Sequence, residues 1–223
     1  MKTGGKCWTA ENKCSIIGMH GMRYTPEFYA GYVAYKDGAV GDLVMLYGPK
    51  SYDFGESRPD FYKKRETYGG TILWVAVHPL DRFQWTGGDI TEVYAAHTLK
   101  GNHGYGEGEG AAVISTHFAN DTIGTISADY LRTKNSGSHG DDQLRIAGSR
   151  GVIEIMHGKP ILTNGDTTPR ELELKPEDDF FGDFCRSLQG QGTCRLTMED
   201  TFNVSKIALC AKESADTRTL IKL

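Results

Sequence analysis

The stretch GGTILWVAVHPLDRFQWTGG, residues 69–88, carries the side chains best suited to chemistry in this sequence. His78 and Asp81 stand three residues apart within it, and Trp74 and Trp85 flank them. An imidazole with its usual pKa of about 6.5 can take or give a proton near neutral pH. The spacing therefore makes His78 the candidate acid/base, with Asp81 one helical turn away to orient it.

Helical spacing divides this stretch into two faces. At about 100° per residue over residues 71–86, one face is apolar and is predicted to contact the core. Its members are Ile72, Leu73, Ala76, Val77, Leu80 and Phe83. The histidine, the aspartate and the two tryptophans fall in a narrow stripe on the opposite side. Apolar area left in water costs about 25 cal/mol per Å², so a ligand, another domain or another subunit is expected to cover the tryptophans.

A second interpretation of the same stretch stays open. Pro79 removes one helix hydrogen bond, so the helix could begin there and the preceding TILWVAV could form a strand. The stripe would then not exist. In that case His78 is a buried histidine that is hydrogen-bonded to the backbone.

A glycine-rich segment, GYGEGEG at residues 104–110, is the one candidate for a dinucleotide-binding loop. Such a loop follows a strand and opens a helix, whose free N–H groups and dipole meet the phosphates. The next residues here, AAVISTHF, have a strand pattern instead. The segment is therefore predicted to be a flexible loop.

Several histidines and acids lie close together in the sequence without forming a metal-site pattern. They are His97, His103, Glu107, Glu109 and His117. Their spacing matches no closed tetrahedral site, and the five cysteines contain no CxxC pair. We expect no metal ion.

A second polar, glycine-rich segment, TKNSGSHGDDQLR at residues 133–145, offers contacts for a polyhydroxylated ligand. Its candidate side chains are His139, Asp141, Asp142 and Arg145. The alternative for this segment is a mobile surface loop, which is the commonest role of such a composition.

Composition limits the classes of partner. The 223 residues carry a net charge of -4 with no run of Lys and Arg, which argues against nucleic acid. No apolar run approaches the roughly 18–20 residues of a membrane span, so no membrane partner is expected. The N-terminus has no apolar signal region, and an odd number of cysteines suits reduced thiols. These features predict a cytoplasmic protein.

The elements that must position these residues follow a simple order. Thr25-Pro26 opens a helix to about Lys36, and β-rich segments follow. Two helices at 177–188 and 197–215 end the chain and are expected to cover one sheet face. The predicted strands are 14–19, 44–47, 92–99, 112–118, 122–131, 143–148 and 151–156. This order predicts an α+β fold with an open, mainly antiparallel sheet and helices packed on one face.

Four segments in this order resemble a known family. They are MRYTPEFYAGYVAYKDGAVGDLVML, YGGTILWVAVHPLDRFQW, SADYLRT and DDQLRIAGSRGVIEI. From about Cys14 to Leu223 the chain is similar to the C-terminal, substrate-side domain of the Gfo/Idh/MocA oxidoreductases. Relatives have an N-terminal Rossmann domain of roughly 120 residues that binds NAD(P). Its glycine fingerprint and its Glu-Lys-Pro motif are absent from these 223 residues.

The resemblance implies a division of the chain and a function. Residues 1–20 look like a remnant of the last Rossmann helix–strand unit, and residues 21–223 look like the C-terminal domain. The implied function is substrate binding and oligomerisation in an NAD(P)-dependent oxidoreductase that acts on a sugar or cyclitol hydroxyl. NAD or NADP would be bound mainly by a Rossmann domain or subunit, so the chain is expected to be inactive alone. Homo-oligomers would form through the uncovered sheet face.

The resemblance also implies roles for individual residues. His78 is the implied catalytic residue. Many relatives carry an aspartate four residues before this histidine, but Trp74 stands there in this sequence. Only the histidine is therefore carried over as a proton-transfer group. The candidate contacts for a polyhydroxylated substrate are Arg23, Tyr24, Trp74, Asp81, Tyr130, Arg132 and His139. The alternative function is a stand-alone, non-catalytic module that binds a partner or assembles through its sheet.

Overall fold

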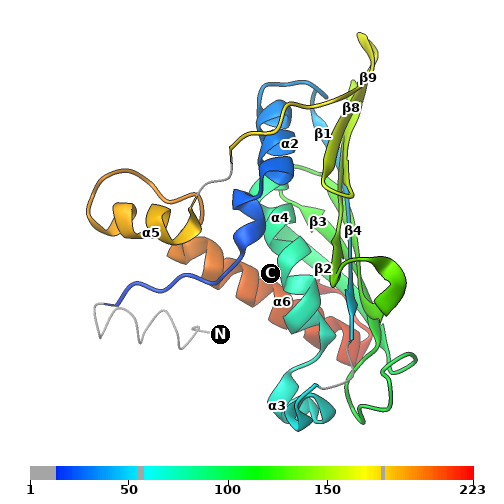
Figure 1. Cartoon of the computed structure of the whole chain (residues 1–223). Coiled ribbons are helices and arrows are strands. Elements are labelled where there is room, and N and C mark those ends of the chain that lie inside the picture. The colour runs from blue at the N-terminus through cyan, green and yellow to red at the C-terminus, as the bar shows by residue number, and fades with distance from the viewer. Residues whose placement is uncertain (1–13, 55–57, 177–178) are drawn as a thin grey trace.

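A wide, open sheet organises the part of the chain that the computed structural model describes, residues 14–54, 58–176 and 179–223 (Figure 1). Ten strands belong to it in these ranges, in the order β10-β2-β3-β4-β1-β6-β7-β8-β9, with β5 paired to β1. Neighbouring strands are antiparallel except β1 and β4, which are parallel. The predicted α+β class with an open, mainly antiparallel sheet is confirmed. The strands are β1 (Leu43–Asp53), β2 (Ile90–Thr98), β3 (Ala111–Phe118), β4 (Ile123–Arg132), β5 (Gly140–Asp142), β6 (Leu144–Gly148), β7 (Gly151–Met156), β8 (Lys159–Asn164), β9 (Thr167–Glu171) and β10 (Ile221–Lys222).

Strands with an apolar pattern were predictable, and strands without one were not. In β3 and β4 every second residue is buried, which is the period that the sequence shows. By contrast β9 is exposed along its whole length, so it carries no hydrophobic signal. The predicted strand at residues 14–19 is wrong, because this segment has no regular secondary structure. A strand needs a hydrogen-bonded neighbour, and none is paired with these residues in the sheet.

Three helices, α2, α4 and α6, cover one face of the sheet (Figure 1). The predicted role of residues 177–188 in covering the sheet is wrong. Helix α5, which begins at Phe180, lies away from the sheet beside the start of α2 (Figure 1). None of the described helices is both long enough and apolar enough to cross a membrane. The helical elements are η1 (Gly21–Tyr24), α2 (Pro26–Lys36), η2 (Asp60–Lys63), α3 (Arg65–Tyr68), η3 (Ile72–Ala76), α4 (Val77–Gly87), η4 (Lys134–Ser136), α5 (Phe180–Leu188) and α6 (Met198–Thr217).

The stretch at residues 71–86 is helical, so the strand interpretation is wrong. It is not one regular helix, however: η3 is a π-helical turn and α4 continues from it. A π turn holds an extra residue, so side chains before and after it do not keep the α-helical phase. Glycines at positions 48 and 124 of the sheet allow α4 to pack close to it. A Cβ at either position would lie within 3 Å of the Phe83 ring on that helix.

Among the described residues, no α-helix covers the second face of the sheet (Figure 1). One row of side chains crosses this face through register partners on β2, β3, β4 and β1. The row consists of Tyr94, Ser115, Thr125 and Tyr47, and Arg145 on β6 extends it. Several large apolar side chains on this face are exposed, among them Tyr47, Tyr94, Val113, Ile123 and Leu131.

Candidate active site

His78 lies in the first turn of α4 and is half-buried. Its ring meets the ring of His20 edge to face, with 6.0 Å between centroids. Burial lowers the pKa of His78 to about 3, and the charge of Lys50 adds to this effect. The expectation of an ordinary histidine pKa is therefore wrong. The lowered pKa leaves the imidazole neutral at physiological pH.

A buried network of three charged side chains lies beside His78. Lys50, on β1, is 2% exposed, and its Nζ donates to both oxygens of Asp142 at 2.6 and 2.5 Å. Arg82, on α4, is fully buried and donates from Nη1 to the same carboxylate at 2.6 Å. Burial favours the protonated acid, but Arg82 and Lys50 outweigh it and hold the pKa of Asp142 below its usual value. Burial lowers the pKa of Lys50.

Aromatic rings form one wall beside this network. The Lys50 ammonium lies 4.4 Å from the centroid of the Tyr52 ring, and the centroid of the His139 ring lies 5.2 Å from the same point. Tyr130 is stacked behind Tyr52 and shares a hydrogen bond of 2.8 Å with the hydroxyl of Tyr68. Burial raises the pKa of Tyr52 to about 12, so its phenol stays protonated. The wall combines apolar ring faces with hydroxyl groups.

Trp74 lies on η3, one π turn before His78, and is 44% exposed. Its ring belongs to an aromatic cluster with Phe61, Tyr62 and Tyr68. Its indole N–H donates to the backbone carbonyl of Tyr68. The predicted exposure of Trp74 is therefore found, although neighbouring rings already cover part of it.

Asp81 and Arg23 form a buried ion pair, and the expectation that Asp81 points away from the core is wrong. Their side chains are 1% and 2% exposed, and three hydrogen bonds of 2.7–3.1 Å join them. Arg23 also donates to Asp200 at the start of α6. Trp85, the last residue of the predicted stripe, stacks on Tyr32 of α2 at 3.9 Å. Asp81 is buried because η1 and α6 pack on its side of α4, whereas the π turn changes only the phase of Trp74 relative to α4.

Two further predicted contacts hold parts of the domain together. The hydroxyl of Tyr24 donates to Asp183 of α5 at 2.7 Å, and its ring is buried. Arg132 donates to the carbonyl oxygens of Ser138 and Ser136 and so fixes the loop that carries His139. The structure thus brings His139 and Tyr130 together around the ring of Tyr52, which the Lys50 ammonium also contacts. It places Arg23, Tyr24 and Asp81 in the packing of helices.

Sequence analysis missed Lys50 and Arg82. A signal for Lys50 was present, because it shares the inward phase of β1 with Leu46 and Gly48, which are buried. A lysine is almost never fully buried unless it is paired, so its place on an inward face indicates a partner. Arg82 gave no such signal, because helix phase alone does not identify its partner. Asp142 was included only as one of several polar loop residues.

The glycine-rich segment forms no phosphate cradle. It leads into strand β3, and its backbone packs against other backbone: a Cβ at Gly106 would lie 2.7 Å from the carbonyl oxygen of Lys63. Glu109 forms an ion pair with Arg65, with 3.0 Å between Oε1 and Nε, and its Oε1 lies 3.6 Å from Nδ1 of His97. This pairing serves structure, and the described residues contain no group of three or more His, Cys, Asp or Glu arranged around a metal position.

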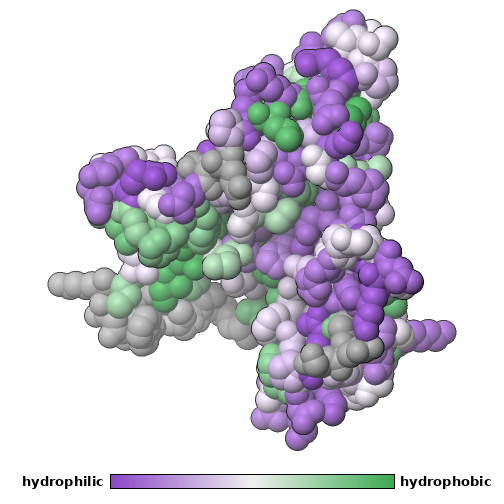
Figure 2. All heavy atoms as spheres, viewed as in Figure 1, coloured by the Kyte–Doolittle hydropathy of each residue, from purple (hydrophilic) through white to green (hydrophobic). Residues whose placement is uncertain are grey.

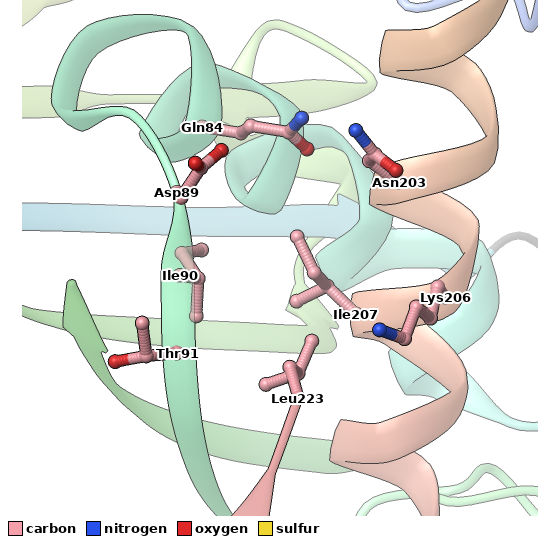
Figure 3. Close-up of a pocket in the computed structure, with 8 residues that line it drawn as sticks. All are labelled: Gln84, Asp89, Ile90, Thr91, Asn203, Lys206, Ile207 and Leu223. Carbon is pink, nitrogen blue, oxygen red and sulfur yellow. The ribbon is translucent and has the colours of Figure 1, made fainter. Parts of the chain in front are cut away.

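A separate pocket of about 250 Å³ lies further along α4, between that helix, α6 and the start of β2 (Figure 3). The side chains of Gln84 and Asn203 extend toward each other across it, and Ile207 and Leu223 form its apolar side (Figure 3). It contains none of the residues that the sequence singled out. Neither His78 nor any residue of the Lys50–Asp142–Arg82 network lines it.

Comparison with known proteins identifies the architecture. A family model described as GFO/IDH/MocA C-terminal domain matches residues 33–154. A protein described as an oxidoreductase from Thermotoga maritima is 39% identical, with a TM-score of 0.92 over 97% of this chain and 66% of that chain. No curated protein sequence matches.

Two further solved structures share the fold at low sequence identity. An inositol dehydrogenase homologue from Azotobacter vinelandii, solved with NADH and myo-inositol, is 15% identical, with a TM-score of 0.79 over 98% of this chain and 67% of that chain. Levoglucosan dehydrogenase is 15% identical, with a TM-score of 0.77 over 92% of this chain and 65% of that chain. The chain thus spans about two thirds of the length of the structures that it matches.

Proposed function

The chain belongs to the Gfo/Idh/MocA oxidoreductase family, and from this membership we propose that it is the substrate-binding side of an NAD(P)-dependent oxidoreductase. The proposed reaction interconverts a hydroxyl group of a sugar or cyclitol and the corresponding ketone. One observation carries the proposal: half-buried His78 lies beside the buried Lys50–Asp142–Arg82 network and an aromatic wall. Dehydrogenases that share the fold, including one solved with myo-inositol, support this substrate class.

Each group of the site has a proposed part in handling the substrate. Neutral His78 accepts the proton of the reacting hydroxyl, because an imidazole without a proton on one ring nitrogen is a hydrogen-bond acceptor. Lys50 stabilises the oxygen as it loses that proton. Trp74 and His139 contact the rest of the substrate, and Tyr130 holds the aromatic wall in place. Arg23, Tyr24, Asp81 and Arg132 support the site through packing.

NAD(P) would be bound mainly by a Rossmann domain or subunit, because the glycine-rich segment does not fit phosphate groups. We propose that this partner packs against residues 14–20 and α5. Met19 is 80% exposed and Phe181 is 68% exposed, and Figure 2 shows hydrophobic residues gathered beside α5. Helix α5 has no buried residue although its apolar residues share one face, which is typical of a helix that meets a partner.

The proposal predicts opposite results for the chain alone and for the chain joined to a Rossmann domain of the same family. Alone, it should show no micromolar binding of NAD or NADP in calorimetry, since the described residues form no phosphate-binding loop. Joined in frame behind such a domain, it should reduce NAD(P) with at least one member of a panel of sugars and cyclitols, followed by nicotinamide absorbance.

The two experiments test different parts of the proposal. Micromolar NAD(P) binding by the chain alone would refute the division of labour between the domains. A joined protein that binds NAD(P) but oxidises no member of the panel would favour the alternative function, a non-catalytic module. Reduced thiols at Cys185, Cys194 and Cys210 support the cytoplasm as the compartment of either form.

We further propose that the uncovered sheet face joins two copies of the chain. Exposed Tyr47, Tyr94, Val113 and Ile123 give this face a large apolar component, and water-exposed apolar faces of this size favour association. The chain should therefore be a dimer or larger at tens of micromolar in sedimentation velocity. The double variant Tyr47→Glu/Val113→Glu should raise the dissociation constant about tenfold or more, because it places charges in the contact.

A control for this test lies on α6. Leu209 is similarly exposed but belongs to a helix, so Leu209→Glu should leave the dissociation constant unchanged. A wild-type chain that sediments as a single monomer at these concentrations would contradict the proposed assembly.

A further inference from the structure

The charges within the Lys50–Asp142–Arg82 network do not balance. Lys50 and Arg82 are both buried, and both bind the single carboxylate of Asp142. Other acids pair with cations outside the network: Asp141 lies 3.5 Å from Arg132, and Asp81 shares Arg23 with Asp200. The network therefore carries one excess positive charge. A buried charge without a counter-charge is unfavourable, because it has lost its water without gaining a partner.

The hydrogen-bonding capacity of the network is also incomplete. The two Lys50 hydrogen bonds both go to Asp142, which leaves one of the three N–H donors of its ammonium available. The buried Nε of Arg82 has no hydrogen-bond partner among the described residues. Its Nη2 reaches the carbonyl oxygen of Gln143 only at 3.5 Å. Buried donors without acceptors are rare, so such a donor indicates that a further group accepts a hydrogen bond from it.

From this charge excess and these unfilled donors we infer that the substrate carries a carboxylate group, so that the site takes a sugar acid or another polyhydroxylated acid in preference to a neutral polyol. This inference rests on the proposed function and deepens it. One carboxylate supplies one negative charge, which equals the excess, and its oxygens accept charge-assisted hydrogen bonds from ammonium and guanidinium groups. A phosphate would bring about two charges and overcompensate the network.

The carboxylate also has a consequence for His78. The excess charge of Lys50 helps to keep the imidazole unprotonated, together with burial. A bound anion offsets that charge, so the pKa of His78 rises when the substrate binds. The histidine then becomes a better proton acceptor in the complex than in the free domain.

The test compares two six-carbon ligands, D-gluconate and sorbitol, which differ only in a carboxylate and a neutral CH₂OH at one end. Binding to the chain is followed by NMR through the ring signal of His78, which the His78→Asn variant identifies. We expect gluconate to bind at least about tenfold more tightly at low salt, as one charge-assisted hydrogen-bonded pair provides. The ring signal should also titrate at higher pH in gluconate than in the free chain.

Substitutions of Lys50 test whether the preference for gluconate depends on this residue. Lys50→Met should abolish the preference for gluconate, and Lys50→Arg should keep part of it because the charge remains. Lys159→Met, at an exposed position on β8, is the matched control and should keep the full preference. Should Lys50→Met fail to fold, as circular dichroism would show, the wild-type comparison and Lys50→Arg still decide the matter.

Each outcome has one meaning. Sorbitol binding as tightly as gluconate would overturn the carboxylate inference and leave the proposed function standing. Tighter binding of sorbitol 6-phosphate than of gluconate would replace the carboxylate by a phosphate and overturn the stated class. If no ligand moves the His78 signal, the inference and the proposed function both fail.

Discussion

Replacing His78 with asparagine should lower the turnover of the joined enzyme by roughly 10²–10⁴-fold, which is the usual contribution of a positioned acid or base. Asparagine keeps a similar size and a hydrogen bond but cannot accept the hydroxyl proton. Substrate binding should therefore change much less than turnover. Steady-state kinetics, with substrate affinity measured separately by calorimetry, distinguish these two effects.

The pH dependence gives a second readout of the same residue. Because the pKa of His78 is about 3 in the free domain, its neutral, accepting form is already complete well below neutral pH. The value of kcat/KM should therefore show no loss from His78 protonation between about pH 8 and pH 5, where an ordinary histidine would titrate at about 6.5. A break near pH 6.5 that disappears in His78→Asn would contradict the burial and charge argument.

A matched histidine lies on the outer face of the sheet. The side chain of His117 is 44% exposed and lies 3.1 Å from Asp121. His117 pairs with Ile123 of β4, whereas Lys50 pairs with Ala128 of the same strand, five residues further on. His117→Asn should therefore keep normal turnover. Near-normal turnover in His78→Asn as well would show that His78 serves structure alone.

Replacing Asp81 with asparagine should destabilise the folded chain by about 3 kcal/mol or more, because it leaves the buried guanidinium of Arg23 without its main counter-charge. Asp200 remains as a partner at 3.2 Å, but it is partly exposed and binds Arg23 through one nitrogen only. The loss should therefore lie at the lower end of the range for a broken buried ion pair. Urea unfolding monitored by circular dichroism measures it.

Two comparisons separate charge burial from a general loss of packing. Asp60→Asn removes an exposed partner of Lys63 and should leave the unfolding free energy nearly unchanged. The double variant Arg23→Met/Asp81→Leu should be less destabilised than Asp81→Asn, since it removes both charges together. If Asp81→Asn unfolds at the wild-type urea midpoint, the ion pair contributes nothing to stability.

Much of the fold follows from local pattern. The alternation in residues 112–118 and 122–131 predicted β3 and β4, because one side of each strand faces a core and the other does not. Thr25-Pro26 predicted the start of α2, since proline suits the first turn of a helix. The family resemblance and the choice of His78 also came from residue types in order. Short strands such as β5 and β10 lack enough residues to show a period.

The partners of the charged residues were decided only by the tertiary structure. Lys50 and Asp142 are 92 residues apart, Arg82 and Asp142 are 60 apart, and Arg23 and Asp81 are 58 apart. The sequence determined that Asp81 lies close to His78 along the chain. It did not determine that η1 would pack against this side of α4 and bury Asp81 against Arg23. Periodicity reports which side of an element is apolar, whereas a buried ion pair depends on which two elements the packed core brings within a few ångströms.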